Sequence, residues 1–131
     1  MFCFSQGTSC EAVLGSWAVR STARDVLALL GAHLAANANP PPQTPLAAAI
    51  RLAQMPIRAT DDANYTIGLG WRTHLATGTK LKTGSGDGFE SVMQYQVDKG
   101  VALVVLSNSY LTAPHDVDTT SDAIWQQLLV M

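Results

Sequence analysis

The chain has 131 residues, which allows one domain at most, able to bury about two thirds of its unfolded surface. Hydrophobic residues make up 47% and charged residues 14%, which is more apolar than a small self-contained domain usually needs and suits a piece that packs against something else. The net charge of −2, without a Lys/Arg cluster, excludes a nucleic-acid-binding protein, and no apolar stretch is long enough to span a membrane.

Residues 1–15 show no clear periodicity, and we predict an irregular N-terminal segment there. The start has neither a positively charged region nor an adequate apolar stretch, so it does not resemble a signal peptide and leaves the localisation unknown. Cys3 and Cys10 are the only cysteines, and their spacing does not fit a metal site. We interpret them as free thiols, with a disulfide as the alternative in an oxidising compartment.

Two helices are predicted in the first half of the chain. Thr22 and Asp25 have the spacing of a capping box, and apolar residues follow at helical spacing, which predicts an amphipathic helix over about 22–36. Three consecutive prolines end it. A threonine followed by proline then opens a shorter helix, predicted over 46–54, that stops before Pro56.

Strands are predicted in the second half. Residues 58–64 are expected to form a polar loop and Tyr65 to Arg72 a strand. A meander of three closely spaced strands follows, over Thr79 to Lys82, Glu90 to Val97 and Val101 to Ser107. A three-residue loop that ends in glycine joins the last two strands as a hairpin.

The strand that begins at Val101 is apolar as far as Leu106, which indicates burial on both faces. The preceding strand fills one of its edges, and nothing else in the chain obviously fills the other. A final amphipathic helix is expected over about 116–130. The predicted fold class is therefore α+β, with an antiparallel sheet of three to four strands flanked by helices.

The most informative motif is Lys82-Thr83-Gly84, because it closes a strand and is followed by a glycine-rich turn and a hairpin. A bare Lys-Thr-Gly occurs by chance in many chains, and an isolated lysine at a strand end is usually only solvated. This position is much less common, and it resembles the third motif of serine β-lactamases and penicillin-binding proteins.

Four stretches together resemble the C-terminal third of a class C β-lactamase-like serine hydrolase with the β-lactamase/DD-peptidase fold. They are Arg20-Ser21-Thr22-Ala23-Arg24-Asp25, Gly68-Leu69-Gly70-Trp71, Lys82-Thr83-Gly84 with Gly88-Phe89, and Val104-Val105-Leu106-Ser107-Asn108. Their order and spacing carry the resemblance, which covers about residues 16–131. The resemblance implies that this range is the C-terminal part of a β-lactamase-like domain.

The resemblance also implies roles for five residues. The ammonium of Lys82 would place positive charge beside the catalytic centre, and the hydroxyl of Thr83 would bond a substrate carboxylate. Gly84 has no Cβ, so a substrate backbone can lie against the strand. The N–H of Ser85 matches the family's oxyanion-hole donor, and Asn108 matches an asparagine that helps to hold the substrate carboxylate.

Two parts of the family's site have no match in these residues: the Ser-x-x-Lys nucleophile motif and the Tyr-x-Asn or Ser-x-Asn motif. Thr77 and Lys80 imitate the first spacing, but they lie in a predicted turn and not at the head of a helix. Without the nucleophile no acyl-enzyme can form, so the chain alone is predicted to be inactive. The substrate class, whether β-lactam, D-Ala-D-Ala peptide or ester, stays open.

No cofactor and no metal site is expected, because the histidines have no carboxylate or cysteine at ligand spacing and the aspartates near the last helix are typical of a helix start. The expected partners are a small-molecule substrate in the complete protein and either an N-terminal fragment or a second copy of the chain. The alternative function is a non-catalytic binding or structural module, dimeric through an open strand edge. A gene start placed too late is a further explanation for the missing motif.

Overall fold

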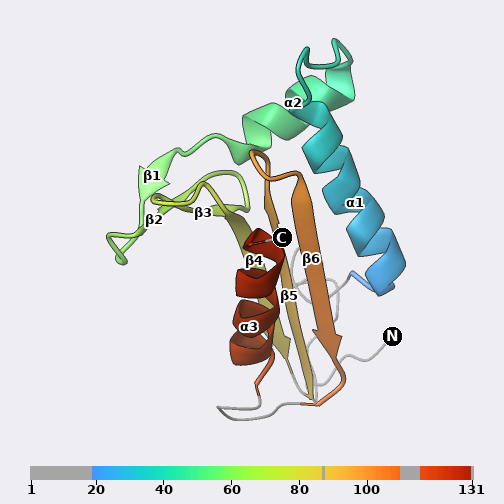
Figure 1. The fold of residues 1–131 in the computed structure, drawn as a ribbon, viewed down its shortest axis with the longest axis vertical. Helices are drawn as coiled ribbons and strands as arrows, with labels where there is room; N and C mark the ends of the chain where they lie inside the picture. The colour runs from blue at the N-terminus through green and yellow to red at the C-terminus, as the bar shows by residue number, and fades with distance from the viewer. Residues whose placement is uncertain (1–18, 87, 110–115, 131) are drawn as a thin grey trace, which may run out of the picture.

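The computed structural model describes residues 19–86, 88–109 and 116–130 (Figure 1). These residues form three helices and six strands. In chain order they are α1 (Ala23–Ala36), α2 (Pro45–Gln54), β1 (Arg58–Ala59), β2 (Tyr65–Ile67), β3 (Arg72–His74), β4 (Lys80–Gly86), β5 (Phe89–Gln96), β6 (Val101–Ser107) and α3 (Val117–Leu129). The predicted α+β class is confirmed. Within the described residues no helix is long and apolar enough to cross a membrane.

The sheet is a continuous antiparallel meander whose spatial order, β1 to β6, is the chain order. It has six strands and not the three to four that were predicted. One additional strand, β1, lies inside the predicted loop 58–64. The predicted strand from Tyr65 to Arg72 contains β2, a turn and the first residue of β3, which continues to His74. The chain reverses between β2 and β3 at Gly70, whose φ of 93° is a conformation that favours glycine.

The turn between β2 and β3 is docked on the end of α2. The N–H of Gly68 donates to the carbonyl of Trp71 at 2.8 Å, and the N–H of Leu69 donates to the carbonyl of Ala53 at 3.1 Å. A Cβ at Gly68 would lie 2.5 Å from the carbonyl oxygen of Met55 and 2.9 Å from that of Ala53. The glycine is therefore required by the close approach of two backbones.

The helices begin where their caps predict. The Thr22 hydroxyl accepts from the N–H of Asp25 at 3.2 Å, as the capping-box spacing indicated. Thr44 accepts in the same way from the N–H of Ala47 at 3.2 Å. The carboxylate of Asp116 accepts from the Thr119 N–H at 2.7 Å. Hydrogen bonding from the backbone and side chain of Thr119 lowers the pKa of Asp116.

The core lies where α1 meets the sheet. Leu30, Trp71 and Tyr95 form its buried centre, and half-buried residues of β5 and β6 pack against them. Helix α3 also contacts β5 and β6, so the two helices take opposite faces of the same strand pair. Val92 and Gln94 alternate with the residues that face α1, and both are buried. Strands β5 and β6 therefore lie between the two helices and contact both of them.

Strand β6 is half-buried over most of its length, and Leu106 is 46% exposed. Both of its faces contact helices, but less completely than the run of apolar residues predicted. Its second edge has no partner strand within the described residues, as expected from the sequence. The predicted segment 1–15 and both cysteines lie outside the residues that the structure describes.

Candidate functional site

Strand β4 carries the Lys-Thr-Gly motif and is paired unequally on its two sides. Along β5 the pairing runs from Lys80 opposite Tyr95 to Gly86 opposite Phe89. On the other side, β3 pairs only as far as Leu81, opposite Arg72. From Lys82 onward, the outer edge of β4 therefore has no strand partner among the described residues.

The backbone of β4 presents particular groups to this free edge. The N–H of His74 donates to the carbonyl of Thr79 at 2.9 Å, so the main-chain groups of Thr79 point toward β3. Backbone groups alternate in direction along a strand, so every second residue points the same way. The main-chain N–H and C=O of Thr83 and Ser85 therefore face the free edge, beyond the end of β3.

The side chains of the motif are accessible. Lys82 lies opposite Met93, which packs against the core on the α1 face, so Lys82 projects on that face of the sheet. Lys82, Thr83 and Ser85 are all exposed. The same part of β4 thus carries the exposed ammonium group of Lys82 and the main-chain groups of Thr83 and Ser85, which have no strand partner among the described residues.

Gly84 lies opposite Ser91, and the two residues are in close contact. The Ser91 hydroxyl donates to the Gly84 carbonyl at 3.3 Å, and a Cβ at Gly84 would lie 2.8 Å from that hydroxyl oxygen. A larger residue here would have to displace the Ser91 side chain. Glycine keeps the surface of the strand flat on the side where Lys82 projects.

Asn108 lies at the same end of the sheet but farther away. It follows Ser107, the last residue of β6, which pairs with Glu90, and Glu90 in turn pairs with Ser85. Two strand spacings, about 10 Å, separate the outer strands of this row. The register therefore places Asn108 across β5 from the Lys-Thr-Gly motif.

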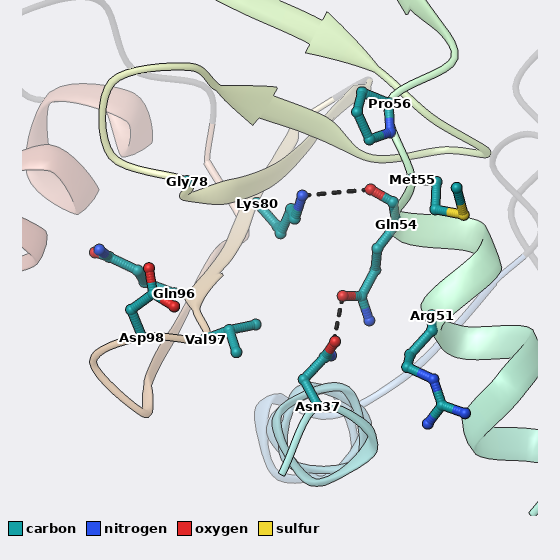
Figure 2. A pocket seen from close by; sticks show the side chains of 10 residues that line it. All are labelled: Asn37, Arg51, Gln54, Met55, Pro56, Gly78, Lys80, Gln96, Val97 and Asp98. Atoms are coloured by element: carbon teal, nitrogen blue, oxygen red, sulfur yellow. Dashed lines mark hydrogen bonds between the residues drawn. The ribbon is translucent and has the colours of Figure 1, made fainter. Parts of the chain in front are cut away.

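The described residues also form an open pocket of about 350 Å³, with both polar and apolar lining, between the ends of α1 and α2 and the adjoining ends of β4 and β5 (Figure 2). Lys80 reaches into it from β4, and its Nζ donates to the Gln54 carbonyl at 3.3 Å and to the Thr73 hydroxyl at 3.0 Å. Burial lowers the pKa of Lys80. Because Gln54 is the last residue of α2, this ammonium stabilises the helix C-terminus.

Sequence reasoning missed this pocket, because it treated Thr77 and Lys80 only as an imitation of the nucleophile motif. The structure confirms that the pair is not at the head of a helix: Thr77 lies in the turn after β3, and Lys80 opens β4. The alternation of side chains between the two faces of a strand could have indicated this site. Lys80 is two residues before Lys82 and must lie on the same face, about 7 Å away.

The two histidines in the described residues both pack against aromatic rings. His33 is buried against the rings of Trp71 and Tyr95. His74 packs against the Tyr65 ring, while His115 lies outside the described residues. No group of three potential metal ligands occurs in the part of the chain that the structure describes.

Comparisons with known proteins identify the family. The family model described as Beta-lactamase matches residues 5–126, a range that includes both α1 and the complete sheet. No curated protein matches the chain. The family match extends well beyond the Lys-Thr-Gly motif, so it does not depend on three residues that occur often by chance. The chain therefore belongs to the beta-lactamase family.

Proposed function

We propose that the chain is the C-terminal part of a class C β-lactamase-like serine hydrolase that acts on β-lactams, D-Ala-D-Ala peptides or esters through an acyl-enzyme. In this proposal β4 supplies the substrate-binding strand, and the nucleophilic serine belongs to polypeptide outside these 131 residues. The observation that carries the proposal is the free edge of β4, where the backbone of Thr83 and Ser85 has no strand partner among the described residues.

The free edge suits a substrate that resembles an extended peptide. Such a substrate adds to a sheet edge through main-chain hydrogen bonds. The Ser85 N–H would then lie beside the scissile carbonyl and stabilise its developing negative charge, a contribution of about 3 to 4 kcal/mol in comparable sites. Lys82 and the Thr83 hydroxyl would attract the substrate carboxylate, and Asn108 would assist from across β5.

Binding without turnover tests the proposal. Benzylpenicillin titrated into the labelled chain should shift the amide NMR signals of Thr83 and Ser85. The chain alone should hydrolyse neither nitrocefin nor p-nitrophenyl esters above the buffer rate. Lys82→Met should raise the Kd about tenfold, the cost of one charge-assisted hydrogen bond of about 1.5 kcal/mol.

Lys99→Met is the matched control, because Lys99 is exposed in the β5–β6 turn at the other end of the sheet. This variant should keep the original Kd. Shifts confined to other parts of the chain, or equal losses in the two lysine variants, would contradict the assignment. Turnover by the chain alone that disappears in Lys82→Met would refute the claim that an external nucleophile is needed.

A second candidate function is a non-catalytic module that pairs with a copy of itself or with an N-terminal fragment. The unpartnered edge of β6 among the described residues favours it, because an exposed strand edge readily pairs with another chain. Light scattering coupled to size exclusion separates the candidates. A stable dimer that does not bind benzylpenicillin supports the module, whereas aggregation relieved by an added N-terminal fragment supports the hydrolase.

A further inference from the structure

The polar side chains beneath the end of α2 form one connected, buried network. Nδ1 of His33 lies 3.1 Å from the hydroxyl of Tyr95 and 3.0 Å from Nε2 of Gln54. The Gln54 side-chain oxygen accepts from Nδ2 of Asn37 at 3.0 Å, as Figure 2 shows. His33, Gln54 and Tyr95 are at most 6% exposed, so water cannot readily replace these bonds.

The pattern of donors requires a neutral His33. Because the Gln54 oxygen is occupied by Asn37, the Gln54 amide presents its NH₂ group to the imidazole. Nδ1 must therefore accept a hydrogen bond, which places the ring proton on Nε2. Burial lowers the pKa of His33, consistent with this state. Burial also raises the pKa of Tyr95, so its hydroxyl stays protonated, and it shares the single lone pair of Nδ1 with the Gln54 amide.

A proton on Nδ1 creates a conflict that the network cannot absorb locally. The N–H of the imidazolium could donate to the Tyr95 hydroxyl oxygen, but it would also face the NH₂ of Gln54, which would lose its acceptor. Rotating the Gln54 amide would relieve that contact but direct its NH₂ at the NH₂ of Asn37. Rotating Asn37 as well would sacrifice its 2.7 Å bond to the His33 carbonyl. Each local adjustment therefore leaves a buried donor without an acceptor.

The charged groups around the network do not favour a proton on His33. Lys80 of β4 donates to the Gln54 carbonyl, and Arg51 of α2 donates to the carbonyls of Ala36 and Pro42. Both cations line the same pocket as Gln54, together with the carboxylate of Asp98 from the β5–β6 turn. Against two nearby cations, one carboxylate offers an imidazolium little net stabilisation.

We propose that His33 is an acid-sensitive switch, which holds the C-terminal end of α2 against the sheet when neutral and loosens it when protonated. The network joins α1, α2 and β5, and Lys80 extends it to β4, so loosening the end of α2 also widens the pocket that Lys80 and Gln54 line. This inference does not depend on the proposed hydrolase function, because it concerns only the contacts within this chain.

The direction in which stability changes with pH follows from the linkage between proton binding and folding. The histidine pKa is lower in the folded than in the unfolded chain, where it is about 6.5. The stability is therefore complete above about pH 6.5 and falls as the pH drops from there to the folded pKa, below which it levels off. Each unit of pKa lowering reduces the folding equilibrium constant about tenfold.

The test follows hydrogen exchange of the α2 amides and urea unfolding of the full chain between about pH 7.5 and pH 5. Protection at the end of α2 should fall on acidification, beyond the intrinsic change in exchange rate. His33→Asn should remove this fall, because the asparagine oxygen takes the place of Nδ1 but does not titrate. His74→Asn is the matched control and should retain it, since its Nδ1 contacts only the local Thr77 hydroxyl.

Equal pH dependence in the original chain and in His33→Asn would overturn the proposal. If His33→Asn does not fold, NMR titration of the His33 ring in the original chain decides instead. A midpoint below that of His74, with α2 amide signals changing over the same pH range, supports the switch. A His33 midpoint at or above that of His74 refutes it.

Discussion

At the scale of single residues, two glycines with the same intrinsic flexibility have opposite energetic roles. Gly31 lies in the middle of α1, and a Cβ built on it would meet no atom within 4 Å. Gly68 is pressed against the carbonyls of Ala53 and Met55. The first glycine costs the helix stability, and the second permits the β2–β3 turn to dock on α2.

Gly68→Ala should lower the free energy of unfolding by about 1 to 3 kcal/mol, because backbone atoms must move apart to admit the methyl group. Gly31→Ala should raise it by about 0.5 to 1 kcal/mol, because the helix interior loses its most flexible residue without a clash. Urea unfolding of the two variants and the original chain provides the measurement. Equal effects in the two variants would show that the turn is not closely packed on α2.

Sequence reasoning at this scale found the motif residues but not their surroundings. Lys82, Thr83, Gly84 and Ser85 could be selected because their types and order are visible in the chain. Their roles in catalysis remain proposals. The pocket around Lys80 could not be predicted, because it depends on the carbonyl of Gln54, which lies 26 residues away in the sequence. No local pattern encodes that contact.

At the scale of elements, α2 shows how a short helix is held at both ends. Its first turn is capped by the Thr44 hydroxyl, and Pro45 has the fixed φ of a first helical residue. At its other end, the Leu69 N–H and the Lys80 ammonium satisfy the carbonyls of Ala53 and Gln54. These end contacts stabilise a helix of 10 residues, which would be marginal in isolation.

Thr44→Ala should lower the free energy of unfolding by about 1 kcal/mol, because the N–H of Ala47 loses its acceptor. Thr44→Asp should restore most of it, since a carboxylate accepts the same bond and suits the positive end of the helix dipole. Thermal and urea unfolding report both changes. A Thr44→Asp variant no more stable than Thr44→Ala would mean that the cap contributes little.

Elements whose ends are set by neighbouring residues could be predicted, whereas elements that depend on contacts with distant residues could not. The observed helices begin and end within about a residue or two of the predicted ranges, because caps and prolines act on neighbouring residues. Strands β5 and β6 were found because one alternates and the other is continuously apolar. The prediction ended the preceding strand at Lys82, but β4 continues to Gly86, so the Lys-Thr-Gly motif lies inside the strand and part of the predicted turn is strand. Strands β1 to β3 were missed or merged, because their short pairings depend on the docking of Gly68 against a distant helix.

At the scale of the whole molecule, the sheet has an open β6 edge within the described ranges. Strand β6 has no charged residue, and Leu106 near its end is 46% exposed. Long apolar edges without charges are prone to pair with other chains. The apolar composition and this uncharged edge therefore both indicate a chain that packs against another polypeptide.

Leu106→Lys should reduce concentration-dependent association of the chain, because a charge on an edge strand must be desolvated when a second strand pairs there. Ile124→Lys is the control, since Ile124 is also exposed but lies on α3. Light scattering over a range of concentrations gives the apparent mass of each variant. Identical association of both variants and the original chain would place the contact elsewhere.

The agreement between spatial order and chain order in the sheet has a kinetic consequence. Every strand pair is a contact between consecutive segments, so the loop-closure entropy of each pairing is small. Hairpins of this kind form on the microsecond timescale, and the β4–β5–β6 meander can assemble before α1 arrives from the other end of the sequence. Mutations in these hairpins should therefore slow folding, whereas mutations in the contact of α1 with the sheet should mainly accelerate unfolding.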